Sequence, residues 1–152
     1  MDDILDPICR ELRVNLLVGT GFESITLILQ LLRRVQRHRK PAHILYVSDH
    51  DRAGKKMPIQ VARQVQYWRE TLGIDVEVTV EQVALTADQI RQYRLPHDPG
   101  EETRVELDAL EALHPGVLAD LVRHAVEPYR DRTLPGRLAD AKREAAGQAA
   151  SE

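Results

Sequence analysis

Apolar and polar positions along the chain alternate between two kinds of segment. Short continuous apolar runs that stop at Gly or Asp are typical of buried strands, whereas apolar residues three or four positions apart indicate helices. The pattern predicts strands over residues 13–18, 43–48, 74–80 and 104–108. It predicts helices over residues 24–38, 57–72, 86–93 and 115–131, with a loop over 95–103.

This order of elements predicts the fold class. Continuous apolar strands separated by amphipathic helices indicate an α/β protein with a mostly parallel four-stranded sheet and helices on both faces. The strict alternation over 74–80 favours a half-exposed strand near a sheet edge. In such sheets, chemistry is expected outside the carboxyl ends of the strands.

The length of 152 residues suits one domain, which we expect to cover residues 1–134. Residues 135–152 are polar and rich in Ala, a composition that fits either a marginal helix or a disordered tail. Hydrophobic residues make up 43% of the chain and charged residues 30%, a balance typical of globular proteins rather than disordered ones.

The net charge of −3 conceals a strong segregation of charge. Residues 33–69 contain ten Lys or Arg and two acidic residues, a local charge of +8. Residues 70–111 contain eleven acidic residues and three Arg, a local charge of −8. The basic segment is compatible with a polyanionic partner. Alternatively, the two segments are solvated helix faces of opposite charge.

The single cysteine, Cys9, excludes a disulfide framework and a cysteine-based zinc site, and it favours a reducing cytoplasm. The acidic start of the chain does not resemble a signal peptide, and no apolar run is long enough to cross a bilayer. We therefore expect a cytoplasmic protein without a membrane partner.

The strongest candidate for chemistry follows the second predicted strand. Asp49 and Asp51 stand one residue apart there, so both side chains can point to the same side. A hard divalent cation would remove their mutual repulsion, and oxygen ligands with room for water suit Mg²⁺, with Mn²⁺ as a substitute. The alternative is that these aspartates cap the following helix, which Gly54 helps to begin.

Glu23 is the only acidic residue between Glu11 and Asp49, and it lies just after the first predicted strand. If the first two strands are neighbours, it converges with the aspartates as a metal ligand or a catalytic acid or base. The alternative is a carboxylate that stabilises the first turn of a helix. Glu106 and Asp108, two apart on the fourth predicted strand, are candidates for an additional metal site or for a solvated strand face.

The segment Ile44-Leu45-Tyr46-Val47-Ser48-Asp49-His50-Asp51-Arg52-Ala53-Gly54 resembles the second signature of the toprim domain family. That family includes bacterial primases, type IA topoisomerases, the A subunit of topoisomerase VI and the overcoming-lysogenization-defect nucleases. The first strand followed by Glu23 resembles the first signature. Residues 104–110 are similar to the topoisomerase VI A-subunit branch.

The resemblance implies a Rossmann-like toprim fold in which Asp49 and Asp51 hold Mg²⁺ and Glu23 is catalytic. Arg52, Lys55 and Lys56 leave the same loop and are expected to contact phosphates. Family members that hold broken DNA covalently use a tyrosine on a separate winged-helix domain. None of the tyrosines here has the context of a nucleophile, so a protein partner would have to carry that domain.

Three functions follow from this reading. The first is Mg²⁺-dependent phosphodiester chemistry on nucleic acid, either DNA nicking or cleavage or the reaction of a topoisomerase-like toprim module. The second is a non-catalytic toprim-like module that binds DNA or a partner protein. The third is an aspartyl-phosphate phosphatase, which is disfavoured because Ala53 stands where Thr or Val is expected.

Overall fold

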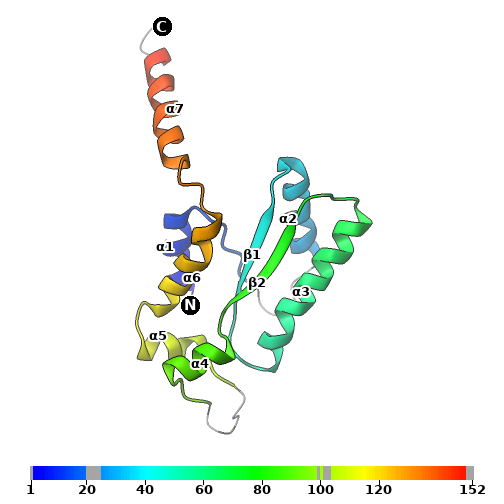
Figure 1. The fold of residues 1–152 in the computed structure, drawn as a ribbon, viewed down its shortest axis with the longest axis vertical. Coiled ribbons are helices and arrows are strands. Elements are labelled where there is room, and N and C mark those ends of the chain that lie inside the picture. Colours follow the sequence, from blue (N-terminus) through cyan, green and yellow to red (C-terminus); the bar gives the residue numbers. More distant parts are fainter. Residues whose placement is uncertain (1, 20–24, 99, 101–103, 150–152) are drawn as a thin grey trace.

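The computed structural model describes residues 2–19, 25–98, 100 and 104–149 (Figure 1). This described part of the chain is mostly helical and contains one small parallel sheet. Its elements in chain order are α1 (Asp2–Leu12), α2 (Ile25–His38), β1 (Ala42–Val47), α3 (Arg52–Thr71), β2 (Val78–Ala84), α4 (Ala87–Tyr93), α5 (Leu107–Leu113), α6 (Val117–Val126), the 3-10 turn η1 (Glu127–Tyr129) and α7 (Leu134–Ala149).

The sheet consists of β1 and β2, which run parallel with Ala42 opposite Val78. A register shift between Tyr46 and Val47 brings Val47 opposite Ala84. Helices cover both faces, with α2 and α3 on one side and α1 and α6 on the other (Figure 1). The α/β class, the parallel pairing and the two helical layers predicted from the sequence are confirmed.

Each face of the sheet has its own apolar core, because the side chains of a strand alternate between faces. Ile44 and Tyr46 of β1 pack against the α2–α3 core, whereas Leu45 and Val47 pack against the core on the other face. The α2–α3 core is formed by Ile28, Leu32, Val35, Val61, Val65 and Ile74. The other core joins α1, α4, α5 and α6 around the fully buried Leu85, Val105, Leu110 and Leu118.

The prediction of a four-stranded sheet is wrong, since two of the expected strands are absent from the described residues. Residues 14–19 are irregular, and Leu17 and Val18 are 51% and 59% exposed, so this apolar run does not enter the sheet. Residues 107–113 form α5, where only a short strand over 104–108 was predicted. Leu107 and Leu110 are both buried, and their spacing of three suits a helix.

Two further elements are shifted from their predicted positions. The strand expected over 74–80 is β2 at Val78–Ala84, because Ile74 is buried in the α2–α3 core after a reversal at Gly73, whose φ is +63°. The helix expected from residue 57 begins at Arg52, directly after its N-cap, Asp51. The helix predicted to begin near Thr86 is confirmed, with a capping box between Thr86 and Gln89.

The two ends of the chain are helical. α1, which the sequence analysis did not predict, buries Leu5, Ile8 and Leu12 at helical spacing against α6. α7 extends away from the remainder of the protein (Figure 1), and its described side chains are exposed except for Leu134. Within the described residues, no helix is both long and apolar enough to cross a membrane.

Candidate functional site

The backbone after β1 is held in place from two sides. Ser48 accepts a hydrogen bond from the Leu85 N–H and donates its own N–H to the Ala84 carbonyl, both at 2.8 Å. His50 forms an antiparallel bridge with Val105, with N···O distances of 2.8 and 3.0 Å. The loop that carries Asp49 is therefore fixed between the end of β2 and the segment that leads into α5.

From this position, the Asp49 side chain caps α5. Its Oδ1 accepts a hydrogen bond of 2.8 Å from the backbone N–H of Leu107, the first residue of α5. Glu106, the residue at the N-cap of α5, makes no capping hydrogen bond with its own side chain. A carboxylate from the β1 loop therefore satisfies a backbone donor that the helix leaves unpaired.

Asp51 caps α3. Its Oδ1 accepts a hydrogen bond of 2.5 Å from the Gly54 N–H, in the geometry of an N-cap. The helix passes so close to the preceding loop that a Cβ on Gly54 would lie 2.0 Å from the carbonyl oxygen of Asp49. The capping alternative stated for the two aspartates is thus realised for Asp51, and Asp49 caps a different helix.

A hollow of about 420 Å³ opens at the carboxyl end of β1. Three of the sequence-predicted acidic residues line it together, namely Asp49, Glu106 and Asp108. The remaining lining residues are Gly19, Tyr46, Val47, Ser48, Met57 and Leu107. The fold thus gathers carboxylates from two distant parts of the sequence at the sheet edge where chemistry was expected.

Of the two remaining predicted acidic residues, the structure describes Asp51 and does not describe Glu23. Asp51 is engaged at the start of α3 and does not line the hollow. Glu23 lies outside the described residues, so its convergence with the aspartates stays a prediction. Among the residues that are described, no three His, Cys, Asp or Glu side chains lie close enough to hold a metal ion.

The carboxylates of the hollow differ in how they are bound. Arg104 lies between Glu106 and Asp98, with N···O distances of 2.8 and 3.2 Å, so the two carboxylates share one positive charge. Asp108 is exposed and forms no hydrogen bond or ion pair with the described residues. Asp49 has one carboxylate oxygen, Oδ2, that takes no part in capping α5.

The loop contains one polar group that the sequence analysis missed. The Ser48 hydroxyl oxygen is buried at the hollow and has no hydrogen-bond partner among the described residues. Its place directly before Asp49, at the end of a strand, was the signal available in the sequence. The Nδ1–H of His50 donates to the Leu85 carbonyl oxygen at 3.1 Å, so this side chain also holds the loop against the end of β2.

The predicted phosphate-binding residues lie beside the hollow on α3. Arg52, Lys55 and Lys56 are exposed in the first turns of this helix, and the first turn contains no acidic residue. Cations are unfavourable at a helix N-terminus because the helix dipole is positive there. Their placement is therefore poorly explained by the stability of α3.

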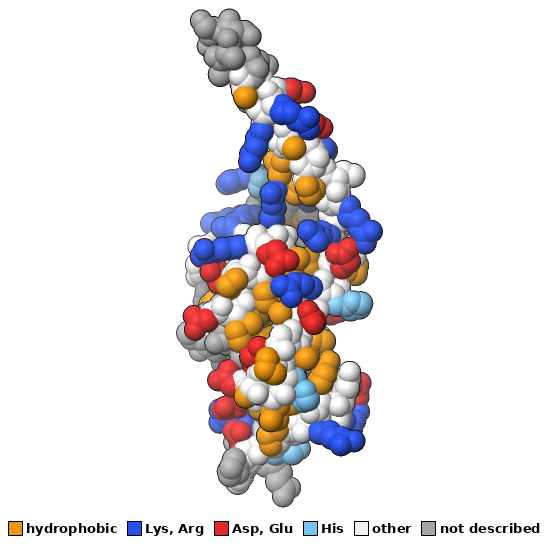
Figure 2. Space-filling model, turned by 90° about the vertical axis from the view of Figure 1, so that its left-hand side faces the viewer, with side chains coloured by type: hydrophobic (Ala, Val, Ile, Leu, Met, Phe, Trp, Pro, Cys, Tyr) orange, Lys and Arg blue, Asp and Glu red, His pale blue; other side chains and the backbone are white. Residues whose placement is uncertain are grey.

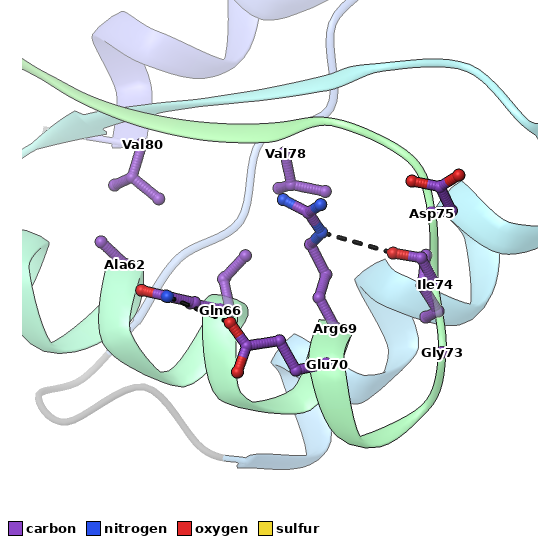
Figure 3. A pocket seen from close by; sticks show the side chains of 10 residues that line it. Ala62, Gln66, Arg69, Glu70, Gly73, Ile74, Asp75, Val78 and Val80 are labelled. Atoms are coloured by element: carbon purple, nitrogen blue, oxygen red, sulfur yellow. Dashed lines mark hydrogen bonds between the residues drawn. The ribbon is translucent and has the colours of Figure 1, made fainter.

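A larger hollow of about 650 Å³ lies elsewhere, between the second half of α3 and β2 (Figure 3). Arg69 donates from Nε to the Ile74 carbonyl at 3.5 Å, and Gln66 donates to Glu70 at 3.1 Å. Among the described residues, none that was predicted for metal binding or phosphate binding lines this hollow. It has no place in the candidate site.

Cys9 carries the single thiol of the chain, a group that can act as a nucleophile. It is 7% exposed in the core, and burial raises the pKa of its thiol, with a smaller contribution from Asp6. A raised pKa keeps the sulfur protonated and weakly nucleophilic at neutral pH. Cys9 therefore belongs to the packing of α1.

Comparison with protein-family models, with curated proteins and with solved structures gave no match to this chain.

Proposed function

We propose that the protein is a toprim-like module that carries out Mg²⁺-dependent chemistry on nucleic-acid phosphodiesters, with DNA nicking or cleavage as its reaction. One observation supports this most directly. Asp49, from the Asp-His-Asp loop, and Glu106 and Asp108, from the segment before and within α5, line a single hollow at the carboxyl end of β1. Cations on the adjacent first turns of α3 suit the phosphates of the substrate.

The donor set fits a hard cation. Mg²⁺ is commonly held through one or two carboxylates and completes its coordination with water and phosphate oxygens, so a closed cluster of three carboxylates is not required. Oδ2 of Asp49, the carboxylate of Asp108 and the unpaired Ser48 hydroxyl are oxygen donors at the hollow. When bound, the ion would polarise the phosphoryl group and stabilise the charge that develops on it.

The protein's own groups have separate roles in this proposal. Asp49 and Asp51 would hold the ion through the carboxylate oxygens that do not cap helices, and Asp108 would supply an additional ligand. Glu106, already paired with Arg104, is better suited to orient that arginine than to bind the ion directly. Glu23 would transfer a proton to or from the attacking or leaving oxygen.

Asparagine variants test the metal role without removing the helix caps, because Asn retains an acceptor oxygen and is a good N-cap residue. Asp49→Asn and Asp51→Asn should each abolish Mg²⁺-dependent nicking of supercoiled plasmid. The matched control is Asp120→Asn, an exposed aspartate on α6, which should cleave as the unchanged protein does. Unchanged cleavage in both loop variants would refute the proposed chemistry.

Binding of the ion has a second readout that does not depend on activity. Mg²⁺ at about ten times its dissociation constant stabilises the folded protein by about 1.4 kcal/mol, or about 4 °C in Tm for a chain of this size. This shift should appear in the unchanged protein and in Asp120→Asn, and it should disappear in Asp49→Asn. A shift that persists in Asp49→Asn would place the ion elsewhere.

A second candidate function is a non-catalytic toprim-like module that binds DNA, or that binds a partner protein carrying the tyrosine and winged-helix domain. It is favoured by the use of both aspartates as helix caps, a structural role that needs no metal. This function predicts DNA or partner binding that is the same in Asp49→Asn, Asp51→Asn and the unchanged protein. Plasmid nicking by the unchanged protein would exclude it.

A further inference from the structure

The outer side of the α2–α3 layer carries exposed cations that form no ion pair with the described residues. With about 3.6 residues per turn, side chains opposite the buried stripe of a helix point away from the protein. α2 buries Ile28, Leu32 and Val35, and α3 buries Gly54, Pro58, Val61 and Val65. The exposed cations opposite these stripes, named here the cationic track, are Arg33, Arg34, Arg37, Arg52, Lys56 and Arg63.

None of the six side chains of the cationic track forms an ion pair with a described residue. α2 contains no acidic residue, and Glu70 is the only one on α3. By contrast, Lys, Arg, Asp and Glu are interspersed over the opposite face of the protein (Figure 2). All ion pairs of the described residues belong to segments outside α2 and α3, such as Arg123 with Glu11 and Asp120.

The cationic track runs the length of the layer. Arg52 and Lys56 lie at the end of α3 beside the Asp49–Asp51 loop, and Arg63 lies near the middle of the helix. Arg33, Arg34 and Arg37 lie in the second half of α2, which ends at the opposite end of the sheet (Figure 1). α3 has 20 residues and so measures about 30 Å, the length of about nine phosphates along one DNA strand.

We propose that the cationic track binds the phosphate backbone of double-stranded DNA and leads the duplex to the hollow at the carboxyl end of β1. Arginine predominates among its residues, and the guanidinium group pairs with phosphate oxygens in a bidentate manner. Ile59 and Tyr67 are the large apolar side chains exposed on α3, too few to give the broad apolar face by which a helix enters a lipid surface. The choice of nucleic acid as the polyanion rests on the proposed function; the charge and exposure of the track do not.

The test measures binding of a fluorescein-labelled mixed-sequence duplex of about 20 base pairs by anisotropy, in EDTA, so that no metal chemistry contributes. Two track variants are compared, R33Q/R34Q/R37Q on α2 and R52Q/K56Q/R63Q on α3. The control, R10Q/R91Q/R143Q, removes the same charge from exposed positions on α1, α4 and α7. All substitutions are at exposed side chains, and circular dichroism verifies that each variant is folded.

Each track variant should bind the duplex about tenfold more weakly or worse at about 100 mM salt, and the control should change affinity less than about twofold. Since each neutralised phosphate contributes about 0.9 to the slope of log K against log salt, each track variant should lower that slope by about 2–3. Equal losses in the control and the track variants would overturn the proposal. So would failure of the unchanged protein to bind the duplex.

Vesicles containing phosphatidylglycerol test the competing anionic surface. Track-dependent binding to vesicles without binding to the duplex would replace DNA by a lipid surface and overturn the proposal. The experiment also separates this inference from the proposed chemistry. Track-dependent duplex binding without any Mg²⁺-dependent cleavage would refute the chemistry and support the track, whereas normal cleavage by both track variants would refute the track alone.

Discussion

Replacing Gly54 with alanine should destabilise the protein, although alanine is the better helix former. Gly54 is the third residue of α3, where alanine would ordinarily stabilise a helix by about 0.5–1 kcal/mol. Here the added Cβ would lie 2.0 Å from the Asp49 carbonyl oxygen and 3.1 Å from the Ser48 hydroxyl oxygen. An ordinary carbon–oxygen contact is about 3.3 Å or longer, so helix and loop would have to separate by more than about 1 Å.

The cost follows from two contributions. Forcing extra volume into a packed site typically costs about 1–3 kcal/mol. Separating α3 from the loop also strains the hydrogen bond from the Gly54 N–H to Asp51, and losing an N-cap costs about 1 kcal/mol. After the favourable propensity of alanine is subtracted, we expect a net loss of about 2–3 kcal/mol in the free energy of unfolding.

Urea denaturation followed by circular dichroism measures this loss. With a slope of about 2 kcal/mol per M, the midpoint should fall by about 1–1.5 M. Gly136→Ala is the matched control, because Gly136 lies in α7 and its added Cβ would meet no atom within 4 Å. That variant should be unchanged or slightly stabilised. A midpoint for Gly54→Ala equal to or above that of the unchanged protein would refute the close packing of α3 against the loop.

Two other predictions concern carboxylates that lie at or just before the start of a helix. In EDTA, Asp51→Ala should lower the free energy of unfolding by about 1 kcal/mol, whereas Asp51→Ser, which keeps a capping oxygen, should recover most of the loss; equal stability of the two variants in urea would contradict the cap. Hydrogen bonds from Thr133 hold the pKa of Asp131 below its usual range, and Arg137 contributes less. The Asp131 carboxylate therefore stabilises the start of α7 at any pH above the ordinary Asp pKa of about 4. This stabilisation is lost as the pH falls through the lower pKa of the folded protein. Protection of α7 amides from hydrogen exchange should therefore not change through Asp131 between pH 7 and 5, and it should fall below about pH 4. If Asp131→Asn gave the same dependence of protection on pH, this role of Asp131 would be contradicted.

The local sequence pattern was sufficient to predict the elements whose apolar period and beginning or end are set by their own residues. α2 and α4 were predicted because each combines a helical apolar period with a recognisable beginning or end. β1 was predicted because its apolar run is continuous and ends at the Asp49–Asp51 loop. α1 also carried such a signal in Leu5, Ile8 and Leu12, but Pro7 and the acidic first residues obscured it.

Elements whose form depends on a distant partner could not be assigned in this way. The apolar run over 14–18 reads as a strand, yet a strand exists only where another strand pairs with it, and no described strand does so. Residues 107–113 form a helix that begins where Asp49, far away in the sequence, caps its first N–H. The alternation of apolar and acidic residues over 105–108 predicted a strand instead, because neither this contact nor the burial of Leu110 can be read from the local pattern.

For the candidate site, the sequence by itself determined which residue types stand at the end of β1 and that the basic residues cluster between residues 33 and 69. Only the tertiary structure decided that Asp49 shares a hollow with Glu106 and Asp108 while Asp51 turns to its own helix. The physical reason is that residue type and spacing follow from the chain alone, whereas the direction of a short carboxylate depends on which unpaired backbone N–H the fold brings within hydrogen-bonding distance.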